Sequence, residues 1–268
     1  MLRIAILQPD PRAAARLADA LTPTYELRSY RTWEQLYGDA PKAPWAGCII
    51  DIYPPDDAVP PWKLGALRQA RPDLAIVVYS DFTDRRHDLF EVGRHKIDAV
   101  ILAGVEDSPK AIQTTLGRSL CSAAAGAVEA ALEGHLAALG VAVVRWAMEH
   151  SFERPTVDEL ARSMGMSRSQ LARELNRKGL PSPRALLLWG RLLQAARLLQ
   201  GGDTTVEGVA HRLGYSTSSA LHRAFHQYVG WPPGAISSRG GMAGVLQSFI
   251  DSQKATGDQS TAVGQSSP

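Results

Sequence analysis

Cysteine is scarce in this chain: its 268 residues include only Cys48 and Cys121. Two cysteines so far apart argue against a disulfide framework and against a zinc ribbon, and we expect both to fill buried space. No stretch approaches the ~18 uninterrupted apolar residues of a membrane span, and the opening LRIAILQPDP lacks a basic leader before an apolar run. These absences favour a cytoplasmic protein without a membrane partner.

Sequence patterns of catalysis are also missing. There is no Gly-rich phosphate loop with a lysine and no G-x-S-x-G turn. His222 and His226 have the spacing of a zinc protease pair, but Arg223 stands where that motif needs a glutamate, and no third ligand is apparent. We therefore expect no enzyme activity, no metal and no cofactor. The tryptophans are expected to be packing residues: Trp62, Trp189 and Trp231.

The formal net charge is only +2, but the charges are unevenly distributed. Residues 1–138 contain 15 Lys and Arg against 18 Asp and Glu, whereas residues 139–239 contain 13 against 7. A segment with such an excess of positive charge suits a polyanionic partner.

The first 120 residues alternate short apolar runs with amphipathic segments. The runs predict strands at 3–7, 25–30, 47–51, 75–80 and 98–102. The segments between them predict helices near 11–21, 32–37, 62–70, 84–94 and 108–119. Strands that alternate with helices imply a parallel sheet covered on both faces. Such a sheet places ligand chemistry at the carboxyl ends of its strands.

The rest of the chain has no strand signal. Residues 121–150 are rich in alanine and predict a helix that is interrupted near Gly140, with residues 121–138 as a helical linker. Short helices follow one another from 156 to 236. The composition of residues 239–268 turns to Gly, Ser, Gln and Thr, which predicts a tail that is disordered from Asp251 onward.

One short pattern occurs twice. Thr156–Asn176 reads TVDELARSMGMSRSQLARELN, and Thr205–Phe225 reads TVEGVAHRLGYSTSSALHRAF. In each copy a threonine is suited to cap a first helix, with an acidic residue in the first turn. A glycine, Gly165 or Gly214, is suited to end that helix, and Ser167 or Ser216 to cap the next. Each copy therefore predicts a helix-turn-helix unit.

The second helix of each unit presents short polar and arginine side chains on the face away from its apolar residues. Arginine can bond both acceptors on a guanine edge, and Ser or Thr can reach phosphates and bases. In the first unit the outward residues are Arg168, Ser169, Ala172, Arg173 and Asn176. In the second unit they are Thr217, Ser218, Ser219, His222 and Arg223.

The segment 184–200, RALLLWGRLLQAARLLQ, predicts a helix between the two units. At 1.5 Å per residue it is roughly 25 Å long. Helices that read the same face of a duplex are about one turn, ~34 Å, apart. A rigid connecting helix of this length suits two readers on one chain, so that successive major grooves are bound without a dimer.

Residues 139–238 resemble the DNA-binding domain of AraC/XylS-type transcription regulators. The motifs are DELARSMGMSRSQLARELNRKG, SPRALLLWGRLLQAARLLQGG and VAHRLGYSTSSALHRAFHQYVGWPP. The resemblance implies an all-α domain with two helix-turn-helix units joined by a long helix. It also implies a phosphate contact for Arg191 and DNA-facing positions for Ser169, Arg173, Ser218, Ser219, His222 and Arg223. The chain departs from the family at Leu180, where glycine is usual, and at Ala220, where an aromatic is usual.

Residues 1–120 resemble the receiver domain of response regulators, a flavodoxin-like fold with a parallel five-stranded sheet. Asp51, followed by Pro54 and Pro55, matches the phosphoacceptor position, and Ser80 matches the hydroxyl that senses it. The family's two acidic Mg²⁺ ligands are replaced by Gln8 and Pro9, with Asp10 next, and Ala103 or Gly104 stands in place of its lysine. Phosphoryl transfer depends on such cations, so we expect Asp51 to be a poor acceptor.

Together these patterns predict a transcription regulator with double-stranded DNA as its partner. We expect the receiver-like domain or the linker helix to form a homodimer, or the domain to bind a signalling protein. Two alternatives remain open: a phosphorelay response regulator phosphorylated on Asp51, and a protein-interaction adaptor without DNA binding.

Overall fold

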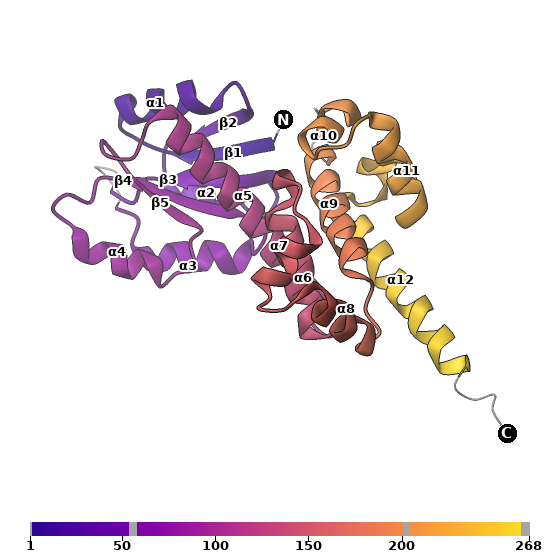
Figure 1. Cartoon of the computed structure of the whole chain (residues 1–268). Coiled ribbons are helices and arrows are strands. Elements are labelled where there is room, and N and C mark those ends of the chain that lie inside the picture. The colour runs from indigo at the N-terminus through magenta and orange to yellow at the C-terminus, as the bar shows by residue number, and fades with distance from the viewer. Residues whose placement is uncertain (1, 54–57, 201–203, 264–268) are drawn as a thin grey trace. The chain divides into compact units, whose positions relative to one another are not determined.

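The computed structural model describes residues 2–53, 58–200 and 204–263, with the side chains of Arg86 and 255–263 left out. The chain divides into two compact units, 1–127 and 128–268, which are taken one at a time (Figure 1). Within the described residues, every helix is too short or too polar to cross a membrane.

The amino-terminal unit alternates strands and helices as predicted. Its strands are β1 (Leu2–Leu7), β2 (Tyr25–Tyr30), β3 (Trp45–Ile50), β4 (Ala75–Ser80) and β5 (Ala99–Leu102). Its helices are α1 (Pro11–Leu21), α2 (Trp33–Asp39), α3 (Pro61–Ala70), α4 (Arg86–Gly93) and α5 (Pro109–Leu132). All strand pairs are parallel, in the order β2-β1-β3-β4-β5. This is the flavodoxin-like order, so the expected receiver-like sheet is confirmed.

Alternation of side chains along the central strands separates two cores. On β4, Ile76 and Val78 belong to the core under α2, α3 and α4, whereas Val77 and Tyr79 belong to the core under α1 and α5. Because both faces are covered, β4 is buried along its whole length. The sheet is therefore the middle layer of three (Figure 1).

Two expectations for this unit are wrong, and one is confirmed. Helix α5 runs without a break through the predicted boundary at residue 120, and Leu120 and Ala123 are part of the core under α1 and α5. Trp62 is not a packing residue, because 62% of it is exposed on α3. Cys48 and Cys121 are buried, as expected.

The carboxyl-terminal unit is helical. Its α-helices are α6 (Ala138–Glu149), α7 (Val157–Ser163), α8 (Arg168–Arg177), α9 (Pro183–Leu199), α10 (Val206–Arg212), α11 (Ser218–Tyr228) and α12 (Gly241–Val263). Three short 3₁₀ turns are η1 (Ser151–Glu153), η2 (Pro233–Ala235) and η3 (Ser237–Arg239).

Helix α9 is the centre of this unit, with most of its residues buried. At Gly190 it crosses α6 so closely that a Cβ atom there would lie 2.6 Å from Cβ of Ala147. On another side, the ring of Trp189 lies 4.9 Å from that of Phe249 on α12. Trp231 is also buried, so the expected packing role is confirmed for Trp189 and Trp231.

The structure also corrects the predicted helix break and tail. The break lies between α5 and α6, where Gly134 has φ +83°, whereas Gly140 lies inside α6 next to Leu180. Helix α12 occupies residues 241–263 of the predicted tail, and its first part is held by the buried Val245 and Phe249. Residues 264–268 lie outside the described residues.

Candidate nucleic-acid interface

The first helix-turn-helix unit is α7, the turn at Gly165, and α8. Thr156 caps α7 and Ser167 caps α8, and each forms a capping box with the residue three positions on. Gly165 has φ +67°, which suits glycine at the end of a helix. The caps predicted for this unit are confirmed.

The second unit is α10, the turn at Gly214, and α11. Thr205 caps α10 as predicted, with its hydroxyl 3.1 Å from the amide of Gly208. The cap of α11 is Thr217, whose hydroxyl accepts from the amide of Ala220 at 3.2 Å, and the prediction of Ser216 is wrong. The extra residue of this copy lies before the cap, so that Ser167 corresponds to Thr217.

The outward face of α8 is open to solvent. Leu171 and Leu175 are fully buried and fix the orientation of the helix. The opposite side presents the predicted residues, all of them exposed: Arg168, Ser169, Ala172, Arg173 and Asn176.

In α11 the buried face is likewise marked by two fully buried side chains, Leu221 and Phe225. Ser219 and Arg223 are exposed, whereas Ser218 and His222 are half-buried. The Thr217 hydroxyl already serves as the helix cap, which leaves it less suited to read a base.

The arginines of the two faces differ in their local partners. Arg168 lies 3.8 Å from the carboxylate of Asp158, a pair that is largely exposed. Neither Arg173 nor Arg223 takes part in a salt bridge with any side chain that the structure describes. Both guanidinium groups are therefore available to an external anion.

Arg191, the expected phosphate contact, is only half-exposed on α9. Its Nε is buried without a hydrogen-bond partner among the described residues. The guanidinium carbon lies 5.6 Å from the ring centroid of Tyr215, in the turn of the second unit. Burial raises the pKa of Tyr215 to about 12. The contact between Arg191 and Tyr215 therefore packs α9 against the turn of the second unit.

Sequence reasoning missed the segment that lies against the second turn. Arg154, which has φ +54°, extends its side chain over Gly214, where a Cβ atom would lie 2.0 Å from Nε of the arginine. Nearby, the guanidinium carbon of Arg212 lies 5.7 Å from the ring centroid of Phe152. The linear pattern gives no signal for these contacts, because they join residues about sixty positions apart.

The second candidate site is the carboxyl edge of the sheet at Asp51. The Ser80 hydroxyl donates to Oδ1 of Asp51 at 2.6 Å and accepts from the amide of Ile52 at 2.9 Å. The amide of Tyr53 also donates to Oδ1 of Asp51, at 3.0 Å. The structure thus brings together the two residues that the sequence predicted. Pro54 and Pro55 lie outside the described residues.

The side chains near this edge do not form a metal pocket. Gln8 accepts from the amide of Asp10 and donates to the carbonyl of Tyr79. The carboxylate of Asp10 caps α1, accepting from the amide of Ala13 at 2.8 Å. No group of three or more Asp, Glu, His or Cys side chains suited to a metal occurs in the described part of the chain.

A positively charged side chain does lie beside the sheet, but it contacts residues other than Asp51. Arg16 on α1 lies 3.0 Å from the carboxylate of Asp107 and 3.1 Å from the hydroxyl of Tyr79. Burial opposes ionisation of Asp107, but hydrogen bonds from Gly104 and Tyr79 outweigh it and hold the pKa of Asp107 below its usual value. Asp107 thus accepts a hydrogen bond from the amide of Gly104, one of the two residues that stand in place of the receiver lysine.

Solved receiver domains are among the structures similar to this chain. A response regulator receiver domain from Methanospirillum hungatei has 17% identity, covering 45% of this chain and 94% of that chain, at a TM-score of 0.40. A BeF3-activated DrrB receiver domain has 15% identity, covering 45% of this chain and 97% of that chain, at a TM-score of 0.39. These values are low, and the strand order itself defines the fold.

Sequence comparisons concern the carboxyl-terminal unit. Residues 160–239 match the family described as helix-turn-helix domain. An AraC-like transcription regulator of Streptomyces lividans is 37% identical over 108 residues, which are 39% of this chain and 36% of that protein. The helix-turn-helix transcriptional activator RhaS of Escherichia coli is 30% identical over 105 residues, 39% of this chain and 37% of that protein. The match thus spans little more than a third of these relatives. On this evidence, the carboxyl-terminal unit contains a helix-turn-helix domain, and over this segment the chain is similar to AraC-like transcription regulators.

Proposed function

We propose that this chain is a transcription regulator whose helices α8 and α11 enter successive major grooves of one duplex. The observation that carries the proposal is the pair of capped helices with exposed arginines, joined through α9. Helix α9 has 17 residues and a mostly buried surface, so it is a rod of roughly 25 Å held by the core. A rod of this kind supports a fixed separation between two readers.

Specific roles follow from exposure and chemistry. Arg173 and Arg223 are suited to guanine edges or phosphates, because both are exposed and lie on the outward faces. The remaining polar contacts are assigned to Arg168, Ser169, Asn176, Ser218, Ser219 and His222. We assign Thr217 mainly a structural role, as the cap of α11.

The test is duplex binding by the full chain. A target is first selected from random duplexes, and affinity is then measured at several salt concentrations. We expect a steep loss of affinity as salt rises, because bound phosphates release counterions. Arg173→Ala and Arg223→Ala should each weaken binding by about 1–3 kcal/mol if they read a base.

Arg12→Ala is the matched control, because Arg12 is an exposed arginine of the amino-terminal unit. This variant should bind like the wild type. Salt-independent binding, or unchanged affinity in both interface variants, would favour the adaptor alternative over a DNA reader.

For the amino-terminal unit we propose a dimerisation or partner-docking role without ordinary Mg²⁺-dependent phosphorylation. Support comes from Asp10, which caps a helix, and from Asp51, whose Oδ1 is bonded to Ser80 and Tyr53. Incubation with acetyl phosphate and Mg²⁺, followed by intact mass measurement, should give no phosphoryl adduct. An adduct that disappears in Asp51→Ala would support the phosphorelay alternative. Sedimentation analysis tests the homodimer separately.

A further inference from the structure

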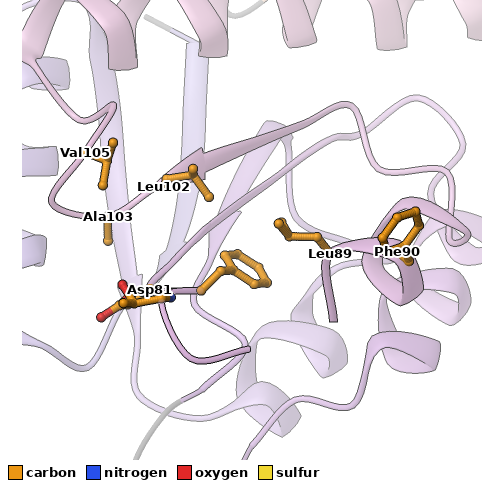
Figure 2. A pocket seen from close by; sticks show the side chains of 8 residues that line it. Asp81, Leu89, Phe90, Leu102, Ala103 and Val105 are labelled. Carbon is orange, nitrogen blue, oxygen red and sulfur yellow. Dashed lines mark hydrogen bonds between the residues drawn. The ribbon is translucent and has the colours of Figure 1, made fainter. Parts of the chain in front are cut away.

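A cavity of about 760 Å³ opens at the carboxyl edge of β4 and β5. Figure 2 shows Leu89 and Phe90 of α4 on one side, and Leu102, Ala103 and Val105 at the end of β5 on the other. Asp81, Phe82 and Thr83, which follow β4, complete the lining. All of these residues belong to the amino-terminal unit.

The cavity wall is mainly apolar. Phe82 is a buried part of this wall, with its ring 5.7 Å from that of Tyr53. Among the lining residues, Phe90 and Val105 are 77% and 75% exposed, the two most exposed large apolar side chains of the described residues. Ala103 lines the cavity at the end of β5 and also packs against the core under α1 and α5. An apolar ligand would cover surface that is otherwise in water.

Asp81 supplies the polar end of the cavity. Its Oδ1 accepts from the amide of Thr83 at 2.8 Å and from the hydroxyl of the same residue at 2.6 Å. These hydrogen bonds lower the pKa of Asp81, so that the carboxylate is ionised at neutral pH. Together with the nearby positive charge of Arg85, these bonds favour the carboxylate, which lines the cavity beside the apolar residues.

The size of the cavity favours a small molecule over a protein. Pockets for small ligands measure about 300–1,000 Å³ and are mostly apolar with a few placed polar groups. A stable protein interface needs roughly 20–30 residues a side, whereas this hollow is lined by eight. Its place at the carboxyl edge of a parallel sheet is also the usual place for a ligand in such folds.

We propose that this cavity binds an organic cation with an apolar ring system, its charge toward Asp81 and its rings against the apolar wall that includes Phe90. The proposal does not depend on DNA binding by the other unit, since it concerns only residues 81–105.

Fluorescence titration of the DNA-free full chain tests it, with berberine, a flat aromatic cation, as the probe. We expect saturable one-to-one binding to the wild type. Ala103→Trp, which fills the cavity, and Phe90→Ala, which removes a wall, should each weaken binding by about tenfold, or 1.4 kcal/mol. Asp81→Asn should weaken berberine several-fold without weakening the anionic dye anilinonaphthalene sulfonate.

Trp62→Ala is the matched control, because Trp62 is exposed on α3 and does not line the cavity. It should bind berberine like the wild type. Circular dichroism identifies any variant that fails to fold, and if Ala103→Trp fails, Asp81→Asn and Phe90→Ala decide. Absence of saturable binding, or an equal loss in Trp62→Ala and Phe90→Ala, would overturn the proposal. So would a dimer that Phe90→Ala dissociates while berberine does not bind, because the occupant would then be a second copy of the chain.

Discussion

The side chain of Arg154 occupies the space that a Cβ atom on Gly214 would need, with its Nε 2.0 Å from that position. The equivalent glycine of the first unit, Gly165, has no atom within 4 Å of the corresponding position. Both glycines have positive φ, +76° and +67°. The two turns thus share a backbone conformation and differ in their surroundings.

Alanine substitutions at the two glycines should separate backbone strain from this contact. Gly165→Ala should lower the free energy of unfolding by about 1–2 kcal/mol, the cost of a left-handed residue with a side chain. Gly214→Ala should cost more, because Arg154 must also move. In the Arg154→Ala background, Gly214→Ala should cost no more than Gly165→Ala does in the wild type. Urea unfolding of the single and double variants, compared in a double-mutant cycle, measures this difference. An excess that persists would rule out the Arg154 contact as its cause.

The cap of α11 gives a second pair of variants. Thr217→Ala should lower the free energy of unfolding by about 1 kcal/mol, because the amide of Ala220 loses its acceptor. Ser216→Ala should change it by less than about 0.5 kcal/mol, as for an ordinary surface position. Thermal unfolding of the two variants measures the difference. Equal effects would show that the cap is shared between the two hydroxyls.

Sequence alone predicted the sheet and most of its helices because their signals are local. The run at 75–79 is apolar throughout, as expected for a strand buried on both faces, and it lies in β4. The segment 11–21 predicted a helix from its apolar spacing, and it matches α1 (Pro11–Leu21). In the repeat, Gly165 and Ser167 also carried local signals.

Features set by contacts between distant residues could not be predicted in this way. Ser216 and Thr217 are both competent caps, and the choice depends on the length of the turn. The polar composition of the segment that forms α12 predicted disorder, because it gives no signal for the contact between Phe249 and Trp189. The helix that carries Arg191 was predicted, but the contact of its guanidinium group with the Tyr215 ring depends on tertiary packing and had no signal in the sequence.

Arg191→Ala should act on stability more than on phosphate contacts. Loss of the arginine beside the Tyr215 ring should lower the free energy of unfolding by about 1 kcal/mol or more, in the range of partly buried cation–π contacts. If Arg191 is not a phosphate contact, the slope of log affinity against log salt stays unchanged. A slope reduced by about one unit, with unchanged stability, would instead restore the phosphate contact. Arg223→Ala, measured in parallel, shows the behaviour of an exposed interface arginine.

The capping box of α7 contains a carboxylate and that of α8 an amide, so they predict that the stability of the protein depends on pH through α7 and not through α8. Glu159 accepts from the amide of Thr156 at 2.7 Å and from its hydroxyl at 2.8 Å. These bonds hold the pKa of Glu159 below its ordinary value of 4.5. The folded state therefore favours the carboxylate, so its stabilisation is complete above the ordinary pKa and is lost as the pH falls through the lowered one.

In α8 the same position is occupied by Gln170, which does not titrate and whose side-chain oxygen accepts from the amide of Ser167 at 2.8 Å. Glu159→Gln keeps an acceptor but removes the titration, so its difference in melting temperature from the wild type should shrink as the pH falls from neutral to acid. Gln170→Glu should do the reverse and gain stability relative to the wild type only at the higher pH, because the new carboxylate also lies at a positive helix end. Parallel pH dependences in all three proteins would show that neither box depends on the charge of its third residue.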